Sequence, residues 1–94
     1  MCLIADSGST KTDWVLTANG QIVDRQQTEG INPVHQNGDG IEQTVRSLAF
    51  SVQRSALSVF FYGSGCTPER SGVVAEVLRR VYDGADVEVQ SDLL

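Results

Sequence analysis

The fold of this chain is decided by residues 2–28, which read CLIADSGSTKTDWVLTANGQIVDRQQT. The stretch opens with an unbroken apolar run, Cys2 to Ala5, bounded by polar and glycine residues. Such a run is typical of a central strand that is buried on both faces. A second strand is predicted over Asp13 to Thr17, where Trp14 and Leu16 share one face.

The turn after the second strand is marked by Asn19-Gly20. This dipeptide favours the positive φ angles that a tight type I′ hairpin turn needs. A third strand, Gln21 to Thr28, follows directly. The sequence therefore predicts an antiparallel meander of three strands.

A loop and a helix follow the meander. Glu29 to Gly38 carries two glycines, one proline and two asparagines without periodicity, which is typical of a loop. Asp39, with Glu42 three residues later, has the pattern of a helix N-cap. A helix is predicted from about Gly40 to Arg54, and its apolar stripe is formed by Ile41, Val45, Leu48 and Val52.

An interior strand is predicted next, over Leu57 to Tyr62, because both of its faces are apolar. Gly63-Ser64-Gly65 ends this strand sharply. Thr67 is then expected to cap a second helix, with Pro68 in the first position, where its missing N–H costs nothing.

The second helix has an apolar stripe and is followed by a last strand. Gly84 closes the helix, and Ala85 to Gln90 alternates apolar with polar residues, as a half-exposed strand does. The order βββαβαβ predicts an α/β domain with a mixed five-stranded sheet whose first three strands are antiparallel. The stripe of the second helix consists of Val74, Val77, Leu78 and Val81.

The two crossover connections place both helices on the same face of the sheet if both are right-handed and run the same way. The opposite face is then uncovered, although Cys2 to Ala5 and Val59 to Tyr62 are apolar on both faces. We therefore expect residues 1–94 to be the N-terminal lobe of a longer protein. A third helix and a second lobe, both absent from this chain, are expected after Leu94.

Composition limits the classes of function. Of the 94 residues, 40% are hydrophobic and 20% charged, as in an ordinary globular domain. A net charge of -5 disfavours binding to nucleic acid or to an anionic membrane. Two isolated cysteines form no disulfide or zinc pattern, and no signal or membrane-spanning segment is present, so a cytoplasmic location is expected.

The connection between the first two strands, residues 6–13, carries groups that suit a phosphate. Gly8 allows close approach of the backbone, and Lys11 supplies an ammonium group. Asp6 could hold Mg²⁺ through water beside such a phosphate. The alternative is an ordinary surface turn, which uses the same residue types. The hydroxyl groups that could join the site belong to Ser7, Ser9, Thr10 and Thr12.

A resemblance to known proteins runs along the whole chain. The pattern Asp6-x-Gly8-x-Thr10-Lys11-Thr12 at the start of a meander resembles the first half-domain of the sugar kinase, heat-shock ATPase and actin superfamily, which has a ribonuclease-H-like fold. With Gly30-Ile31-Asn32-Pro33 and Tyr62-Gly63-Ser64-Gly65-Cys66, it resembles N-acetylglucosamine-kinase-like proteins, which are grouped with the BadF/BadG/BcrA/BcrD ATPases.

The resemblance implies roles for individual residues. Asp6 would hold Mg²⁺, and Asp92 would be the general base that takes a proton from the attacking sugar hydroxyl. The alternatives are a turn residue for Asn32, a strand-to-helix turn for Gly63 and Ser64, and a helix N-cap for Asp92. The terminal phosphates of ATP would contact Gly8, Ser9, Thr10 and Lys11, and the sugar would contact Asn32, Gly63 and Ser64.

The function that the resemblance implies is phosphoryl transfer from ATP, with Mg²⁺, to an amino sugar such as N-acetylglucosamine. The adenine site would lie in the second lobe, so the chain alone is expected to be inactive. One alternative is an ATPase that activates a partner redox enzyme. Another is a non-catalytic interaction module, whose uncovered sheet face recruits a partner or a second copy of the chain.

Overall fold

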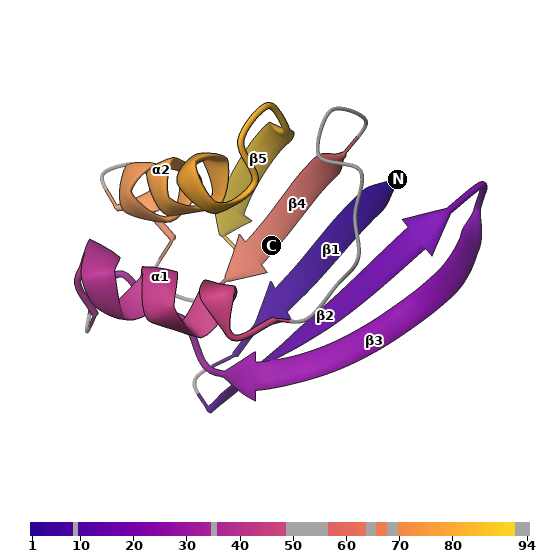
Figure 1. Ribbon diagram of the computed structural model, residues 1–94. Helices are drawn as coiled ribbons and strands as arrows, with labels where there is room; N and C mark the ends of the chain where they lie inside the picture. Colours follow the sequence, from indigo (N-terminus) through magenta and orange to yellow (C-terminus); the bar gives the residue numbers. More distant parts are fainter. Residues whose placement is uncertain (9, 35, 49–56, 64–65, 68–69, 92–94) are drawn as a thin grey trace.

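A five-stranded sheet in the order β3-β2-β1-β4-β5 forms one layer of the domain, and two helices form the other (Figure 1). The computed structural model describes residues 1–94 except 9, 35, 49–56, 64–65, 68–69 and 92–94. Along the described chain the elements are β1 (Cys2–Ser7), β2 (Lys11–Ala18), β3 (Gln21–Glu29), α1 (Gly38–Arg46), β4 (Ser58–Gly63), α2 (Ser71–Val81) and β5 (Asp86–Ser91). The order βββαβαβ and the α/β class are therefore confirmed.

The first three strands form the predicted meander. β1 pairs with β2 and β2 with β3, both antiparallel, whereas β4 lies parallel to β1 and β5 parallel to β4. Asn19 has a φ of 54° and Gly20 a φ of 76°, so both turn residues adopt the left-handed conformation that their sequence predicted.

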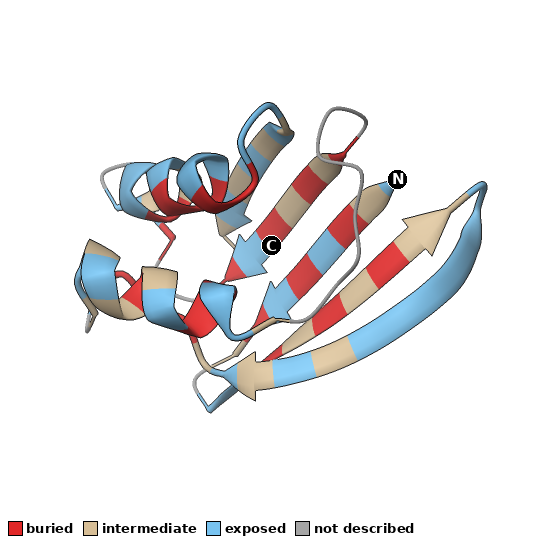
Figure 2. Ribbon diagram, in the orientation of Figure 1, coloured by how far each residue is buried: buried red, intermediate tan, exposed pale blue. Residues whose placement is uncertain are grey.

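Both helices cover the same face of the sheet, and the core lies between them and that face (Figures 1 and 2). Side chains alternate along each strand, so Leu3 and Ala5 of β1 are buried while Ile4 between them is 38% exposed. The opposite face carries Ile4, Val15, Phe60 and Tyr62 in its centre; it has no covering helix in the part of the chain that the structure describes. We call this face, with the side chains of these four residues, the open face.

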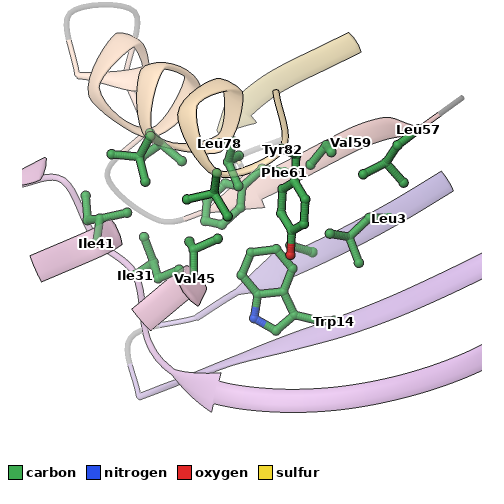
Figure 3. Packing of buried hydrophobic residues seen from close by; sticks show 14 of the residues in the cluster. Leu3, Trp14, Ile31, Ile41, Val45, Leu57, Val59, Phe61, Leu78 and Tyr82 are labelled. Carbon is green, nitrogen blue, oxygen red and sulfur yellow. The ribbon is translucent and has the colours of Figure 1, made fainter. Parts of the chain in front are cut away.

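Trp14 is the largest side chain in the core and is fully buried. Its ring lies 6.0 Å from that of Phe61, centroid to centroid, at an interplanar angle of 58° (Figure 3). Its indole Nε1–H donates to Thr28 Oγ1 at 2.9 Å, so the polar end of the ring is satisfied. Trp14 thus joins the meander to β4, as core packing rather than as a ligand platform.

The first helix differs from its prediction at both ends. Asn37, not Asp39, is the N-cap, and its Oδ1 accepts from the Gly40 N–H at 2.9 Å. Gly38, the first residue of α1, faces α2: a Cβ there would be in ordinary contact with Val73 and Val77, at 3.8 and 3.9 Å. The helix ends at Arg46, earlier than Arg54, and residues 49–54 lie outside the described part.

The second helix begins at Ser71 rather than just after Thr67, and its N-cap residue, Arg70, makes no side-chain capping bond. Thr67 contributes its carbonyl instead, which accepts from the N–H groups of Arg70 and Ser71 at 3.0 and 2.8 Å. Pro68 lies outside the described residues. The predicted apolar stripe is buried throughout, and Gly84 follows the helix with a φ of 85°, as its sequence predicted.

The outer surfaces of the two helices are joined by an ion-pair network. Glu42 Oε2 lies 2.9 Å from Arg46 Nε, and Glu42 Oε1 lies 2.6 Å from Arg80 Nη1. Hydrogen bonds from Arg46 and then from Arg80 lower the pKa of Glu42. Because folding lowers the pKa of Glu42, the network stabilises the fold at neutral pH. This contribution is lost as the pH falls through the pKa that Glu42 has in the folded protein.

None of the helices in the described part combines the length and the apolar character that crossing a bilayer requires.

Candidate functional site

The candidate site lies at the edge of the sheet where the parallel strands β1, β4 and β5 end. Ser7, Gly63 and Ser91 are in register across these three strands, and Thr12 of β2 pairs with Ser7. The chain leaves β1 toward β2 on one side and leaves β4 toward β5 on the other. In open α/β sheets, ligands bind outside the carboxyl ends of strands at such a switch point.

The connection between β1 and β2 is shorter than the sequence suggested. β1 continues to Ser7 and β2 begins at Lys11, so only residues 8–10 lie between the strands. The Gly8 N–H donates to the Lys11 carbonyl at 2.9 Å and is therefore already used within the hairpin. A Cβ on Gly8 would lie 3.7 Å from the Lys11 carbonyl oxygen, which is ordinary van der Waals contact. Ser9 lies outside the described residues.

Ser7 and Thr12 face the core, because they alternate with Asp6 and Asp13 along paired strands. The Ser7 hydroxyl donates to the Ile31 carbonyl at 2.9 Å and accepts from the Ile31 N–H at 2.9 Å. Thr12 Oγ1 donates to the Glu29 carbonyl at 3.0 Å. The expectation that these two hydroxyls surround a ligand is therefore wrong. Thr10 and Lys11 are exposed at the tip of the hairpin.

Asp6 is exposed on the other face of β1, where its cross-strand partners are Asp13 on β2 and Tyr62 on β4. Gln27 Nε2 donates to Asp13 Oδ1 at 2.7 Å. Among the described residues, no ion pair joins either carboxylate to a cationic side chain. Like charges in directly opposite positions repel, and a cation between them would relieve that repulsion.

This carboxylate pair fits Mg²⁺, which proteins commonly hold with one or two carboxylates plus waters and substrate phosphates. The described residues contain no group of three or more acidic, histidine or cysteine side chains that could hold a metal by themselves. Asp6 and Asp13 would thus need oxygens from a ligand or from water to complete a coordination shell. The sequence analysis named Asp6 as a metal ligand and did not name Asp13, which the two-residue alternation of paired strands places beside it.

Lys11 borders a groove of about 600 Å³ that lies over β2 and β3. The groove contains a second cation, Arg25, and the carboxylate of Asp13. The groove is lined by residues of β2 and β3 with charges of both signs, and no described residue of β4 or β5 lines it. Lys11 is therefore placed to reach either the tip of its own hairpin or this groove.

Asn32 forms a turn within the loop between β3 and α1. Its Oδ1 accepts from the Val34 N–H at 2.9 Å, and its own backbone N–H donates to Gln36 Oε1 at 2.7 Å. The turn interpretation of Asn32 is thus confirmed by its side-chain bond. Its amide nitrogen, which has no partner among the described residues, is the group that a sugar hydroxyl could use.

Gly63 is buried, and a side chain there has no room. A Cβ would lie 2.6 Å from Phe61 Cε1 and 3.2 Å from Cys66 Sγ. Cys66 is itself 3% exposed, so its side chain is a small group buried in the core. Ser64 and Asp92 lie outside the described residues, next to Gly63 and Ser91 in the sequence.

Gly63→Ala is expected to lower the free energy of unfolding by about 1–3 kcal/mol, because the added methyl group overlaps the Phe61 ring. Gly72→Ala is the matched control: no atom lies within 4 Å of the added group, and alanine in a helix is about 0.5–1 kcal/mol better than glycine. Urea denaturation measures both. If Gly63→Ala has the same free energy of unfolding as the wild type, the Phe61 ring can move to make room for the added methyl group.

The whole of this chain is similar to a solved structure from Porphyromonas gingivalis that is described as a putative N-acetylglucosamine kinase. The two share 41% sequence identity with a TM-score of 0.91, over 100% of this chain and 35% of that one. Comparisons with protein-family models and with curated proteins found no match. The chain therefore has the fold of one part of a kinase-like protein and spans about a third of that protein's length.

Proposed function

We propose that this chain is the N-terminal lobe of an ATP-dependent sugar kinase that phosphorylates N-acetylglucosamine or a related amino sugar. The observation that carries the proposal is the 41% identity, over the complete chain, to the Porphyromonas gingivalis protein. The BadF/BadG/BcrA/BcrD grouping belongs to the same proposal and rests on the three motifs that begin at Asp6, Gly30 and Tyr62.

ATP binds with its terminal phosphates at the tip of the first hairpin, where Gly8, Ser9, Thr10 and Lys11 lie together in the sequence. The exposure of Thr10 and Lys11 at the tip supports this placement. Mg²⁺, when bound, neutralises charge on the phosphates. Asp6 holds it, and Asp13 on the neighbouring strand adds a second carboxylate.

The sugar binds between the loop at Asn32 and the ends of β4 and β5, where it contacts Asn32, Gly63 and Ser64. Asp92 follows Ser91, which pairs with Gly63, and Gly63 pairs with Ser7 at the base of the hairpin. Phosphoryl transfer requires mostly positioning and charge stabilisation, so one carboxylate near the attacking hydroxyl suffices as the general base.

A third helix covers the open face in the longer protein, and a second lobe closes on the ligands. Two observations support this part of the proposal. Ile4 and Tyr62 are 38% and 37% exposed on a sheet that contains parallel strands, which are normally covered on both faces. The chain also spans only 35% of the Porphyromonas gingivalis protein. Lobe closure would exclude water from the transferring phosphoryl group.

The test compares the full-length protein with the 94-residue chain, using ATP, Mg²⁺ and a panel of amino sugars. We expect the full-length protein to form ADP and sugar phosphate in equal amounts, and the chain alone to form neither. Turnover by the chain alone would contradict the two-lobe proposal. ADP formation without any sugar phosphate would favour the alternative of an ATPase that activates a partner redox enzyme.

The open face supports a second candidate, a non-catalytic interaction module. In this case the exposed Ile4 and Tyr62 recruit a partner or a second copy of the chain. Light scattering on the full-length protein, together with the turnover assay, tests this second candidate. A monomer that phosphorylates sugar excludes a homodimer through the open face, whereas a defined dimer without turnover supports the interaction module.

A further inference from the structure

Two hydroxyl side chains are fully buried within an otherwise apolar core. Ser7 and Thr12 are both 0% exposed, and their oxygens lie 2.8 Å apart. Burying a polar group is costly unless it is hydrogen-bonded, so such a pair needs partners inside the protein. No described side-chain oxygen or nitrogen that is buried lacks a partner. The cluster is therefore a satisfied network, and the position of its partners shows what it joins.

The partners of the two hydroxyls are the backbone of Glu29, the last residue of β3, and that of Ile31 just after it, and a backbone bond holds Gly30 between them. Thr12 Oγ1 donates to the Glu29 carbonyl at 3.0 Å, and the Thr10 carbonyl accepts from the Gly30 N–H at 3.2 Å. Ser7 Oγ accepts from the N–H of Ile31, 24 residues away, at 2.9 Å and also lies 2.9 Å from the Ile31 carbonyl oxygen. Each hydroxyl has one proton, so when Thr12 donates to Glu29, Ser7 donates either to the Ile31 carbonyl or to Thr12 Oγ1. The first hairpin thus holds the backbone of residues 29–31 at each position in turn.

Both ends of this connection lie next to candidate site residues. Ser7 stands between Asp6 and Gly8 in the proposed phosphate site, and Ile31 immediately precedes Asn32 in the proposed sugar loop. The Ile31 side chain is also 0% exposed and packs in the core near Ile41 and Val45 (Figure 3). The backbone of Ile31 therefore has little freedom to move independently of Ser7.

We propose that Ser7 is a positioning residue that couples the phosphate hairpin to the sugar loop. A nucleotide that fixes the hairpin also fixes the backbone before Asn32, so the loop is ordered when the sugar arrives. Sugar affinity then rises when nucleotide is bound, and by linkage nucleotide affinity rises equally when sugar is bound. This inference rests on the proposed kinase function and adds to it an order in which the site is assembled.

The test measures sugar binding to the full-length protein by calorimetry, with and without a non-hydrolysable ATP analogue and Mg²⁺. Wild-type protein is expected to bind N-acetylglucosamine about 5-fold or more tightly when the analogue is present, within the usual range of coupling between sites. Ser7→Ala removes both bonds to Ile31 and is expected to reduce that ratio to about 1. In turnover assays the KM for sugar rises by the same factor that binding loses.

The matched control is Trp14→Phe. It removes a buried hydrogen bond from the same hairpin, the bond from Trp14 Nε1 to Thr28 Oγ1, and leaves the contacts to residues 29–31 intact. A purely structural role for Ser7 predicts that both variants lose stability and keep the wild-type coupling ratio. If Ser7→Ala does not fold, Thr12→Val is measured instead: it keeps the bonds of Ser7 to Ile31, removes the second hydroxyl link from the hairpin to residues 29–31, and is expected to lower the ratio.

The outcomes separate this inference from the function on which it rests. Wild-type protein that binds neither sugar nor nucleotide overturns the proposed function and the coupling with it. Wild-type protein that binds both ligands with a ratio of 1 overturns the coupling alone. A ratio above 1 that Ser7→Ala or Thr12→Val leaves unchanged assigns the coupling to other residues and likewise overturns the proposal.

Discussion

Trp14→Ala is expected to lower the free energy of unfolding by about 3–5 kcal/mol, the usual cost of truncating a buried aromatic side chain. The loss has two parts, because the substitution leaves a cavity beside Phe61 and removes the partner of Thr28. A small domain has only about 5–15 kcal/mol of stability in total. Urea denaturation followed by circular dichroism should therefore show a chain that is largely unfolded or close to it.

Trp14→Phe is the control for this prediction. Phenylalanine keeps an aromatic ring in the core and loses the bond to Thr28, whose hydroxyl still donates to the Glu29 carbonyl at 3.1 Å. A smaller loss, about 0.5–1.5 kcal/mol for the hydrogen bond plus a volume effect, is expected. Equal losses for the two variants would mean that the hydrogen bond to Thr28, and not the packing on Phe61, accounts for the contribution of Trp14 to stability.

Asp92→Asn in the full-length protein is expected to reduce kcat about 10²–10⁴-fold, the usual contribution of general acid–base catalysis. Asparagine keeps the shape of the side chain but cannot accept the proton of the sugar hydroxyl. Nucleotide affinity should stay near the wild-type value, because the proposed phosphate contacts lie on the hairpin at residues 8–11. Steady-state assays of ADP formation, with calorimetry for MgATP, measure the two quantities separately.

Asp6→Ala is the companion variant and should behave in the opposite way. Without the Asp6 carboxylate, the affinity for MgATP itself is expected to fall, while affinity for ATP without the metal changes little. Wild-type activity in both variants would leave Asp92 as a helix cap and Asp6 as a strand residue beside a turn. A loss of nucleotide affinity in Asp92→Asn would place its carboxylate near the nucleotide rather than the sugar hydroxyl.

The strands were predictable from sequence because their signals are local. Asn19-Gly20 fixes a turn by its own backbone preference, and Leu3 and Ala5 alternate with exposed residues as any half-covered strand does. The helix starts were not, because the sequence offers two good cap residues before α1. In the structure Asn37 is the cap, because its Oδ1 accepts from the Gly40 N–H.

In the candidate site, too, the features with a local sequence signal were predictable and those that depend on tertiary contacts were not. Gly63 and Ser91 directly follow the strands predicted over Leu57 to Tyr62 and Ala85 to Gln90, so their meeting at one edge was predictable, whereas Ser7 was expected in the connection at residues 6–13. The bond between Ser7 and Ile31 joins residues 24 positions apart and has no local pattern. The chain was thus expected to present the Ser7 hydroxyl to a ligand, whereas the strand continues through Ser7 and directs that hydroxyl inward.

The border of the open face bears on how this lobe behaves while a longer chain is still being synthesised. N-terminal units generally fold first. In the proposed longer protein, the apolar surface around Ile4 and Tyr62 would therefore be exposed to water before a later segment could cover it. Asp6, Asp86 and Glu88 stand around that surface, and the chain as a whole is strongly acidic. Lys11 and Arg25 lie over β2 and β3 beside the same face, so its charges are of both signs, and only the net charge of -5 on each chain opposes the association of two copies at long range.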